Sequence, residues 1–379
     1  MNIGLNALLM GGTHAGIGNY IYNLLKALAC VDADNKYQVF VNKEYPSGLW
    51  AHNQEPVPVN LMSQRSWARI LWEQVLLPSS IARKDIDIMH FPDYSLPVLL
   101  GSQPSIITVH DLTYKLFPET FSRGKLLTKL ALLGPSLRKA AGIIAVSDNT
   151  KKDLIEVCGV SPERITVVHN GVDLEVFKPM ESGEVRGQLA VKYNLEPGYI
   201  LYVGTLEPRK NITTLIKAFK MLKESRHLPH KLLIAGGKGW LYREIFQAVS
   251  ELGLEQEVLF TGYVPADELP LFYNGAGVFV YPSLYEGFGL PPLEAMACGV
   301  PVVTSDYSSL PEVVGEAGIM VNPTEVEALS DAIDRVLADR QLAERLSVQG
   351  LQRAQGFTWE ECSRKTMAVY TQVYAGQGR

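Results

Sequence analysis

The sequence predicts an α/β protein made of two doubly wound, parallel-sheet domains, and three observations lead to this fold class. Short apolar runs rich in β-branched residues alternate with amphipathic helical patterns in both halves of the chain. The chain has 379 residues, and at about 150 residues per domain this length suggests two or three domains. Hydrophobic residues make up 47% and charged residues 20% of the chain, which is enough apolar material for substantial cores.

Taken in order, the first half is expected to hold seven strands and four helices. The expected strands are 2–8, 37–42, 57–62, 86–91, 105–110, 142–147 and 165–169, and the helices are 17–29, 67–82, 123–140 and 148–157. The second half repeats the pattern, with strands at 199–204, 231–235, 258–262, 278–282, 301–304 and 318–321 and helices at 211–223, 241–252, 267–274, 291–298, 325–338 and 340–354. Turn residues between the halves, at 170–179, indicate a linker. We therefore place the domains at 1–175 and 176–357, with a last helical pattern following.

Composition excludes several functional classes. A net charge of -5 gives no whole-protein reason to expect nucleic acid as a partner. The four cysteines lie far apart without a C-x-x-C pair, which favours reduced thiols of a cytosolic protein over a disulfide or zinc framework. The first residues indicate a strand rather than a signal peptide, and no apolar run approaches the ~20 residues of a membrane helix. We therefore expect a cytoplasmic protein.

The stretch 278–299 has the pattern of a strand, a glycine loop and a helix that together bind a phosphate. An apolar strand leads into a turn containing Gly287 and Gly289, and the helix that follows directs backbone N–H groups and its positive dipole end at one spot. Glu286 and Glu294 lie eight residues apart on this loop and helix. Because carboxylates would repel a phosphate, they are expected to accept hydrogen bonds from hydroxyls. A ligand with phosphates between two sets of hydroxyls is a nucleotide sugar.

This stretch resembles the retaining glycosyltransferases of the GT-B fold, in which two Rossmann-like domains face a cleft. Glu286 and Glu294 match the E-x7-E motif of that class, and the sequence around them, Tyr-Glu-Gly-Phe-Gly-Leu-Pro-Pro-Leu-Glu-Ala-Met-Ala-Cys-Gly, resembles the group 1 (family 4) branch. The alternative is an ordinary strand, loop and helix with incidental acids. The resemblance covers nearly the whole chain, is strongest at 199–323, and implies that the terminal segment 358–379 packs back on the first domain.

A pair of cations is expected to bind the diphosphate. Arg209 and Lys210 follow a strand and Gly204 at the start of the next helix, where Arg supplies a fork of donors and Lys a point charge. They match the family's G-x-x-x-x-R/K-K pattern, although a surface charge pair is the alternative. In relatives, the position of Gly262, Tyr263 and Val264 contacts the base through its backbone.

The glycine loop 11–20 and the strand ending at His110 are the expected ligand-facing parts of the first domain. A dinucleotide site is disfavoured because G-x-G-x-x-G would need glycine where Ile21 stands. By resemblance, the loop at Gly16 lies opposite the donor and His110 beside the donor sugar; Asp111 either orients that imidazole or caps the next turn. A core role for His110 is the alternative. The segment Trp72-Glu73-Gln74 resembles mannosyltransferase-like members, or is a helix with a buried Trp.

A basic and apolar surface in the first domain could contact anionic lipid, with a solvated helix face as the alternative. It consists of Arg123, Lys125, Lys129, Arg138 and Lys139 among leucines, with Arg65, Trp67 and Arg69.

Together these features predict a retaining, metal-independent hexosyltransferase without a cofactor, transferring mannose from GDP-mannose to a glycan or lipid-linked acceptor. UDP-glucose or another UDP-hexose as donor, a nucleotide-sugar epimerase and a non-catalytic binding subunit remain alternatives. The donor-binding residues are expected to be Gly16, Gly204, Arg209, Lys210, Gly262, Tyr263, Val264, Glu286, Gly287, Phe288, Gly289, Leu290 and Glu294; the catalytic ones His110, Arg209, Lys210 and Glu286. Two Asp-x-Asp pairs, 32–34 and 85–87, are not placed to hold a metal at the diphosphate, and the first indicates a solvated turn.

Overall fold

The computed structural model describes residues 1–10, 15–42, 50–59, 66–121 and 123–376. The chain divides into two compact units. The first unit comprises Met1–Gly171 and Trp359–Arg379, and the second comprises Val172–Thr358. Among the described residues, we find no helix with both the length and the apolar character needed to span a bilayer.

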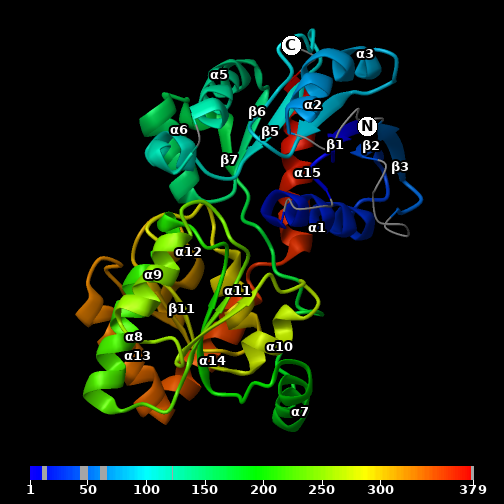
Figure 1. The fold of residues 1–379 in the computed structure, drawn as a ribbon. Helices are drawn as coiled ribbons and strands as arrows, with labels where there is room; N and C mark the ends of the chain where they lie inside the picture. The colour runs from blue at the N-terminus through cyan, green and yellow to red at the C-terminus, as the bar shows by residue number, and fades with distance from the viewer. Residues whose placement is uncertain (11–14, 43–49, 60–65, 122, 377–379) are drawn as a thin grey trace. The chain divides into compact units, whose positions relative to one another are not determined.

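The first unit is built on a seven-stranded parallel sheet in the order β3-β2-β1-β4-β5-β6-β7 (Figure 1). The strands are β1 Asn2–Asn6, β2 Lys36–Asn42, β3 Gln54–Val59, β4 Ile88–Phe91, β5 Ser105–Val109, β6 Gly142–Ala145 and β7 Ile165–Val167. Leu5 of β1 lies opposite both Val39 of β2 and His90 of β4, so the strand order reverses at β1. The seven expected strands are present, but β3 starts three residues early, and the end of its expected range, 60–62, lies outside the described residues.

Helices cover both faces of this sheet. They are α1 Ala15–Val31, α2 Ser66–Leu71, η1 Trp72–Leu76, α3 Leu77–Ile81, α4 Thr113–Leu116, η2 Pro118–Thr120, α5 Arg123–Lys139, α6 Asp148–Cys158, η3 Pro162–Arg164 and α15 Trp359–Ala375. Alternate strand residues point to opposite faces: Val39 and Val41 belong to the hydrophobic cluster shared with α1 and α15, whereas Phe40 belongs to the cluster on the other face. The C-terminal helix α15 lies beside α1 (Figure 1).

The helix expected at 67–82 is not one regular helix. Its middle, η1, is a π-helix in which the N–H of Leu77 bonds to the carbonyl of Trp72, five residues back. Pro78 follows immediately and has no N–H to donate to the regular α-helical ladder, which explains a change of register at this point. Glu73, within this π-helical turn, is buried.

The second unit holds a six-stranded parallel sheet in the order β10-β9-β8-β11-β12-β13. The strands are β8 Tyr199–Val203, β9 Leu232–Ala235, β10 Val258–Gly262, β11 Ala276–Tyr281, β12 Val302–Ser305 and β13 Gly318–Val321. The helices are α7 Ser182–Tyr193, η4 Pro208–Lys210, α8 Ile212–Arg226, α9 Arg243–Glu251, α10 Leu269–Asn274, α11 Leu290–Ala297, α12 Leu310–Val314, η5 Gly315–Ala317, α13 Val326–Ala338 and α14 Arg340–Ala354. Here the order reverses between β8 and β11, and ligands of open α/β sheets bind at the carboxyl ends of strands at such a point.

Two helices of the second unit were not anticipated. Helix α7 buries only Val185 and Leu189, and its Val191 is exposed, so its sequence carries little apolar periodicity. Helix α12 has five residues, too few for a helical period to be recognised. The predicted fold class, two parallel-sheet α/β domains, is confirmed.

Candidate functional site

The loops that follow β8 and β11 meet at the reversal point of the second sheet. Gly204, at the end of β8, has φ +155 and donates its N–H to the carbonyl of Ala235 at 2.9 Å. A Cβ on Gly236 would lie 1.9 Å from the carbonyl oxygen of Gly204, so only glycine fits at this close approach between two backbones. The loop after β8 is therefore held against the end of β9 and leads directly into η4.

Arg209 and Lys210 on η4 contact Glu286 on the loop after β11. The Lys210 Nζ lies 2.7 Å from Glu286 Oε1, and the Arg209 Nη1 lies 3.0 Å from Glu286 Oε2. Lys210 also donates to the hydroxyl of Tyr281 at 2.8 Å, and the N–H of Leu284 donates to the Arg209 carbonyl at 2.9 Å. Three of the residues that the sequence named are therefore brought together at one point.

Burial and charge act in opposite directions on this cluster. Burial disfavours the ionised form of Glu286, but the charges of Arg209 and Lys210 outweigh it and lower the pKa of Glu286 to about 2. Burial, followed by the charge of Arg209, lowers the pKa of Lys210 from its ordinary value, against the attraction of Glu286. Glu286 is therefore a carboxylate throughout the physiological pH range.

Serine side chains that sequence reasoning missed fix the backbone of the Glu286 loop. The N–H of Glu286 donates to Ser308 Oγ at 2.8 Å, and its carbonyl accepts from the hydroxyls of Ser308 and Ser309. Ser309 also donates to the carbonyl of Phe288 at 2.6 Å. These serines follow β12, the next strand of the chain after the Glu286 loop, and no local motif marks them.

A second missed residue is Glu207, which precedes the two cations. Its Oε1 lies 2.6 Å from Arg209 Nη2. Arg209 thus contacts two carboxylates, those of Glu207 and Glu286. An acid close to two bases is common on surfaces, so the sequence alone gave no reason to single it out.

The glycine turn before α11 is strained in a way that requires glycine. Gly289, the residue before the helix, has φ +115, and a Cβ there would meet Leu310 at 2.8 Å. Helix α11 begins at Leu290 and is eight residues long. The unpaired N–H groups and the positive dipole end of α11 therefore lie at the start of the helix, next to the loop of Gly287 to Gly289.

Glu294 is held apart from the cations, on α11. Its Oε2 accepts a hydrogen bond from the hydroxyl of Tyr273 at 2.7 Å. Burial raises the pKa of Glu294 to about 7, against the effect of that hydrogen bond. The two glutamates of the motif therefore have different environments: Glu286 is always charged, whereas Glu294 changes its charge near neutral pH.

The third strand end of this unit presents an aromatic ring. Gly262 has φ +73, and its carbonyl accepts the N–H of Gly236 at 2.8 Å. Tyr263 is 70% exposed, whereas Val264 is buried. The backbone here belongs to the same sheet edge as Gly204.

At the corresponding edge of the first unit, His110 follows β5. Its Nε2 lies 3.1 Å from the carbonyl oxygen of Pro92, which can only accept, so Nε2 carries the proton. The ring of Tyr20 meets the imidazole edge-on at 4.8 Å between centroids. Burial lowers the pKa of His110 against the opposing charge of Asp93. The imidazole is neutral, and its Nδ1 is the nitrogen able to accept a hydrogen bond.

The role of Asp111 in the first unit is resolved at this edge. Asp111 accepts the N–H of Thr113 at 2.9 Å, so it caps the turn that starts α4, and Pro92 orients the imidazole instead. Gly16 lies exposed in the first turn of α1. The glycine-loop residues 11–14 lie outside the described residues.

An ion pair between Arg69 and Glu73 of the π-helix was not predicted. Glu73 accepts from Arg69 Nη1 at 2.9 and 3.1 Å and from the side chain of Asn6, at the end of β1, at 3.1 Å. The interpretation of this segment as a helix with a buried Trp is wrong in one respect, because Glu73 is buried whereas Trp72 is only partly buried. No periodicity argument identifies a π-helix.

Three of the four aspartates in the two Asp-x-Asp pairs accept hydrogen bonds within the first unit. Asp32 is buried and accepts hydrogen bonds from Asp34, Asn35 and Tyr37, so the expected solvated turn is wrong for Asp32. Asp85 and Asp87 accept from Asn2.

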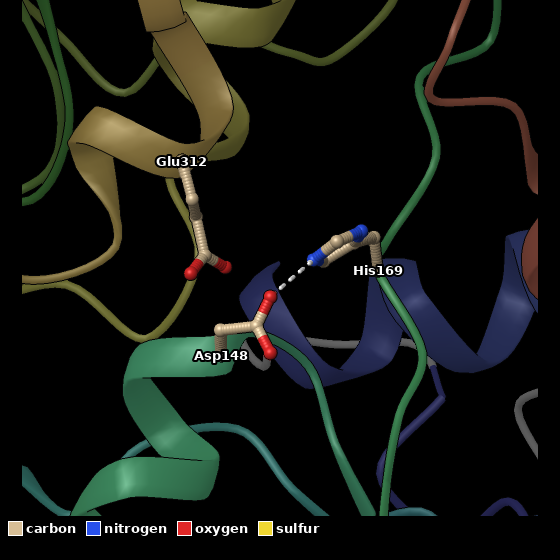
Figure 2. Close-up of side chains that lie close together, drawn as sticks. All are labelled: Asp148, His169 and Glu312. Atoms are coloured by element: carbon tan, nitrogen blue, oxygen red, sulfur yellow. Dashed lines mark ion pairs between the residues drawn. The ribbon is translucent and has the colours of Figure 1, made fainter.

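Figure 2 shows an ion pair elsewhere in the first unit, between Asp148 Oδ2, at the start of α6, and His169 Nε2, after β7, at 4.0 Å. Glu312, drawn with them, belongs to the second unit. Asp148 and His169 would supply only two ligands from the first unit, whereas a structural zinc site has four.

The fold is that of the GT-B glycosyltransferases, and comparisons with known proteins place the chain further. Residues 190–353 match the family model for glycosyl transferases group 1, and residues 14–176 match that for Glycosyltransferase Family 4. O-antigen chain mannosyltransferase B of Escherichia coli is 38% identical over 75% of this chain and 74% of that protein. The chain therefore belongs to the group 1 glycosyltransferases, in their mannosyltransferase-like branch, and the resemblance seen in the sequence is confirmed.

Other relatives and solved structures agree with this assignment. The serotype-specific mannosyltransferase WbdA of Escherichia coli is 29% identical over 75% of this chain but over 36% of its own length. Sucrose-phosphate synthase from Thermosynechococcus elongatus has a TM-score of 0.79 at 26% identity, covering 99% of this chain and 100% of that one. WaaG, a glycosyltransferase involved in lipopolysaccharide biosynthesis, shares the fold with a TM-score of 0.73 at 16% identity, covering 97% of this chain and 98% of that one.

Proposed function

We propose that this glycosyltransferase moves mannose from GDP-mannose to a glycan or lipid-linked acceptor, with retention of the anomeric configuration. The single observation that carries the proposal is the contact of Arg209 and Lys210 with Glu286 at the reversal point of the second sheet. Mannose is favoured because the E. coli relative at 38% identity is named as an O-antigen chain mannosyltransferase. The choice of guanine as the base of the donor rests on the same assignment of the chain to the mannosyltransferase-like branch.

On the donor side, the proposed roles follow from charge. Arg209 and Lys210 would stabilise the negative charge that builds on the departing diphosphate, aided by backbone N–H groups of Gly287 to Leu290. Glu286 would accept hydrogen bonds from hydroxyls of the sugar, and Glu294 from those of the ribose. Gly204 would allow the diphosphate to approach the backbone, while Gly262, Tyr263 and Val264 would contact the base.

No side chain is assigned as a nucleophile in this mechanism. The acceptor hydroxyl would attack the face from which the diphosphate leaves, and the leaving phosphate would take the proton. His110, a neutral imidazole with an accepting Nδ1, would bind a hydroxyl of the donor sugar, and Gly16 would lie close to it. The second unit, which holds the cations, would bind the donor, and the first unit would bind the acceptor.

Metal independence is part of the proposal. Each charge-assisted hydrogen bond to a phosphate is worth about 1.5–3 kcal/mol, so Arg209, Lys210 and the start of α11 together could replace a divalent cation. The expected result is that turnover persists in excess EDTA. Loss of activity in EDTA with recovery on adding Mn²⁺ would contradict this mechanism.

A contact with anionic membrane is proposed for the first unit. Gln74 Oε1 accepts the N–H of Val98 at 2.9 Å, and Lys139 donates to the Val98 carbonyl at 2.9 Å, so η1, this loop and the end of α5 adjoin. Leu76, Val98 and Leu99 are exposed there, beside the Lys139 cation. Exposed apolar side chains next to lysine suit an anionic bilayer surface.

Two of the basic residues expected on the lipid surface, Lys129 and Arg69, have partners within the first unit. Lys129 lies over the rings of Tyr94, Tyr114 and Phe121, 4.6 to 6.0 Å from their centroids, so it packs against aromatic rings. Arg69 pairs with Glu73. Arg65 and the side chains of Trp67 and Lys125 lie outside the described residues. The test is co-sedimentation of the Leu99→Glu, Lys139→Glu variant with anionic and neutral vesicles; binding equal to that of the unmodified protein would refute this surface.

The test of the proposed function combines ligand binding with product analysis. Ligands that bind only the folded protein raise its melting temperature, so GDP is expected to give a larger shift than UDP. NMR of the product formed from GDP-mannose should show the α configuration retained. A shift by UDP alone would favour a UDP-hexose donor, and epimerised donor without acceptor would favour an epimerase.

A further inference from the structure

The two cations proposed to bind the diphosphate are already paired within the second unit. Lys210 lies 2.7 Å from Glu286, and Arg209 lies 3.0 Å from Glu286 and 2.6 Å from Glu207. The cluster holds two positive and two negative charges and is neutral overall. A diphosphate gains less from a neutral cluster than from two unpaired cations, because the carboxylates repel it.

The two carboxylates differ in their freedom to move. The side chain of Glu286 is 9% exposed, and hydrogen bonds from Ser308 and Ser309 fix its backbone. The side chain of Glu207 is 26% exposed, and it extends from the residue just before η4. Rotation of its side chain can carry the Glu207 carboxylate into water, whereas Glu286 would have to move a buried, doubly paired charge.

We propose that Glu207 is a displaceable counter-ion of Arg209. Together with Glu286 and the carbonyl of Tyr285, it holds the guanidinium in position when no diphosphate is bound. It leaves when the diphosphate of the donor enters, and it returns to help expel the nucleoside diphosphate product. Glu286 remains with Lys210 throughout. Glu207 is a positioning residue, because it acts through Arg209, and the inference rests on the proposed donor function.

The proposal predicts an unusual direction of change. Removing the charge of Glu207 leaves Arg209 with a surplus of positive charge, so diphosphates should bind more tightly rather than less. Release of the product should become slower. The Michaelis constant for the donor and the turnover number should therefore fall together, and product inhibition should become stronger.

The experiment is isothermal titration with GDP, UDP and inorganic pyrophosphate. The variants are Glu207→Gln, Glu207→Asp and, as the matched control, Glu344→Gln. Glu344 is an exposed glutamate of the same unit that pairs with Arg340 at 2.7 Å. Glu207→Gln should bind each diphosphate that the unmodified protein binds about tenfold more tightly, with a steeper salt dependence. Glu207→Asp keeps the charge and should stay close to the unmodified protein, as should Glu344→Gln.

The outcomes separate this inference from the proposed function. Equal or weaker diphosphate binding by a folded Glu207→Gln protein would overturn the inference, because a purely structural role predicts loss. If Glu207→Gln does not fold, Glu207→Ser decides by the same criterion. Binding of pyrophosphate without any nucleoside diphosphate would count against the donor proposal, while the pyrophosphate affinities would still decide the role of Glu207. Failure of every protein to bind any diphosphate would overturn both.

Discussion

The two sheets have the same strand-order reversal but carry different chemistry at their carboxyl edges. In the second unit, Arg209, Lys210 and Glu286 meet within hydrogen-bonding distance after β8 and β11. In the first unit, the corresponding edge carries the neutral imidazole of His110 and the amide of Asn6. Similar topologies therefore leave the chemistry to the loops.

The difference teaches how charge is arranged for each proposed ligand. A diphosphate needs fixed cations, and the second edge provides two paired ones, of which Lys210 is buried and Arg209 is partly buried. Hydroxyl groups need neutral donors and acceptors, and the first edge provides an accepting imidazole nitrogen fixed by the Pro92 carbonyl. The Arg69 and Glu73 charges of that edge pair with each other on the helix. The predictions below test this contrast, starting with the largest expected effect.

Lys210→Ala should have the largest effect on turnover. Removing one preorganised charge from a site where negative charge develops lowers turnover by about 100- to 1,000-fold, and added Mg²⁺ should not restore it. The measurement is the initial rate of mannose transfer at saturating donor. Lys217→Ala, an exposed lysine on α8, is the control. A Lys210→Ala protein with near-normal turnover would remove the distinction between the two edges.

Glu286→Ala should destabilise the second unit as well as lower turnover. Removing one partner of a buried ion pair costs about 3–5 kcal/mol, since Arg209 and Lys210 would both lose a carboxylate contact. Urea denaturation measures the change in the free energy of unfolding. Glu344→Gln, at an exposed ion pair, should change it little. A loss below about 1 kcal/mol, typical of an exposed pair, would mean that the cluster is not a buried one.

Glu294→Gln should change the pH dependence of stability. The pKa of Glu294 is raised from 4.5 to about 7 in the folded protein. The folded state thus holds the proton more tightly than the unfolded chain, so the stability from this group is full below pH 4.5 and is lost as the pH rises through 7. The variant cannot ionise, and at pH 8 it should be more stable than the unmodified protein by about 1–3 kcal/mol.

Denaturation midpoints at several pH values between 5 and 8 provide the measurement. The difference between the two proteins should shrink towards pH 5. Glu327→Gln, an exposed glutamate on α13, should follow the unmodified protein. A difference that does not change with pH would show that Glu294 does not titrate in this range. The affinity for the nucleoside diphosphate should also rise with pH more in the unmodified protein than in Glu294→Gln.

Tyr370→Phe, in the first unit, should have an effect on stability no larger than that of Glu294→Gln. The Tyr370 hydroxyl bonds to Nδ1 of the buried His90 at 2.7 Å, and His90 Nε2 bonds to Thr108 at 2.8 Å. Loss of the hydroxyl leaves His90 Nδ1 without this partner, at a cost of about 1–3 kcal/mol. Tyr374→Phe, one helical turn further and 45% exposed, is the control. Equal stability of both variants would show that the buried bond contributes nothing.

The parts of the fold that could be predicted are those with strong local patterns. Most strands of both sheets contain an apolar run, whereas β3 begins with Gln54 and Glu55 and was placed three residues too late. The alternation of strands with helices led to the correct fold class. Helix α7 was not predicted because only two of its residues, Val185 and Leu189, are buried. The π-helix was not predicted because it arises from a shift of backbone hydrogen bonds beside Pro78. Such a shift leaves no signal in the periodicity of the side chains.

The site residues divide in the same way. Arg209, Lys210 and Glu286 could be named because each follows a recognisable strand end, and the structure brings them together. Their roles stay predictions. Glu207, Ser308 and Ser309 could not be named, because their partners are distant in sequence or depend on a loop conformation. Asp111 had two expected roles, to orient His110 or to cap the next turn. It accepts the N–H of Thr113 in that turn, and the imidazole contacts the backbone carbonyl of Pro92 instead. Every residue has such a carbonyl, so the sequence could not identify this contact.

The return of α15 to the first unit has a consequence for the order in which the protein is made. Residues 172–358 form a continuous segment inserted within the first unit, and all of them are synthesised before Trp359 and Tyr370 exist. Domains generally fold as units while the chain emerges from the ribosome. The sheet of the second unit can therefore complete its core first, while the sheet of the first unit waits for α15.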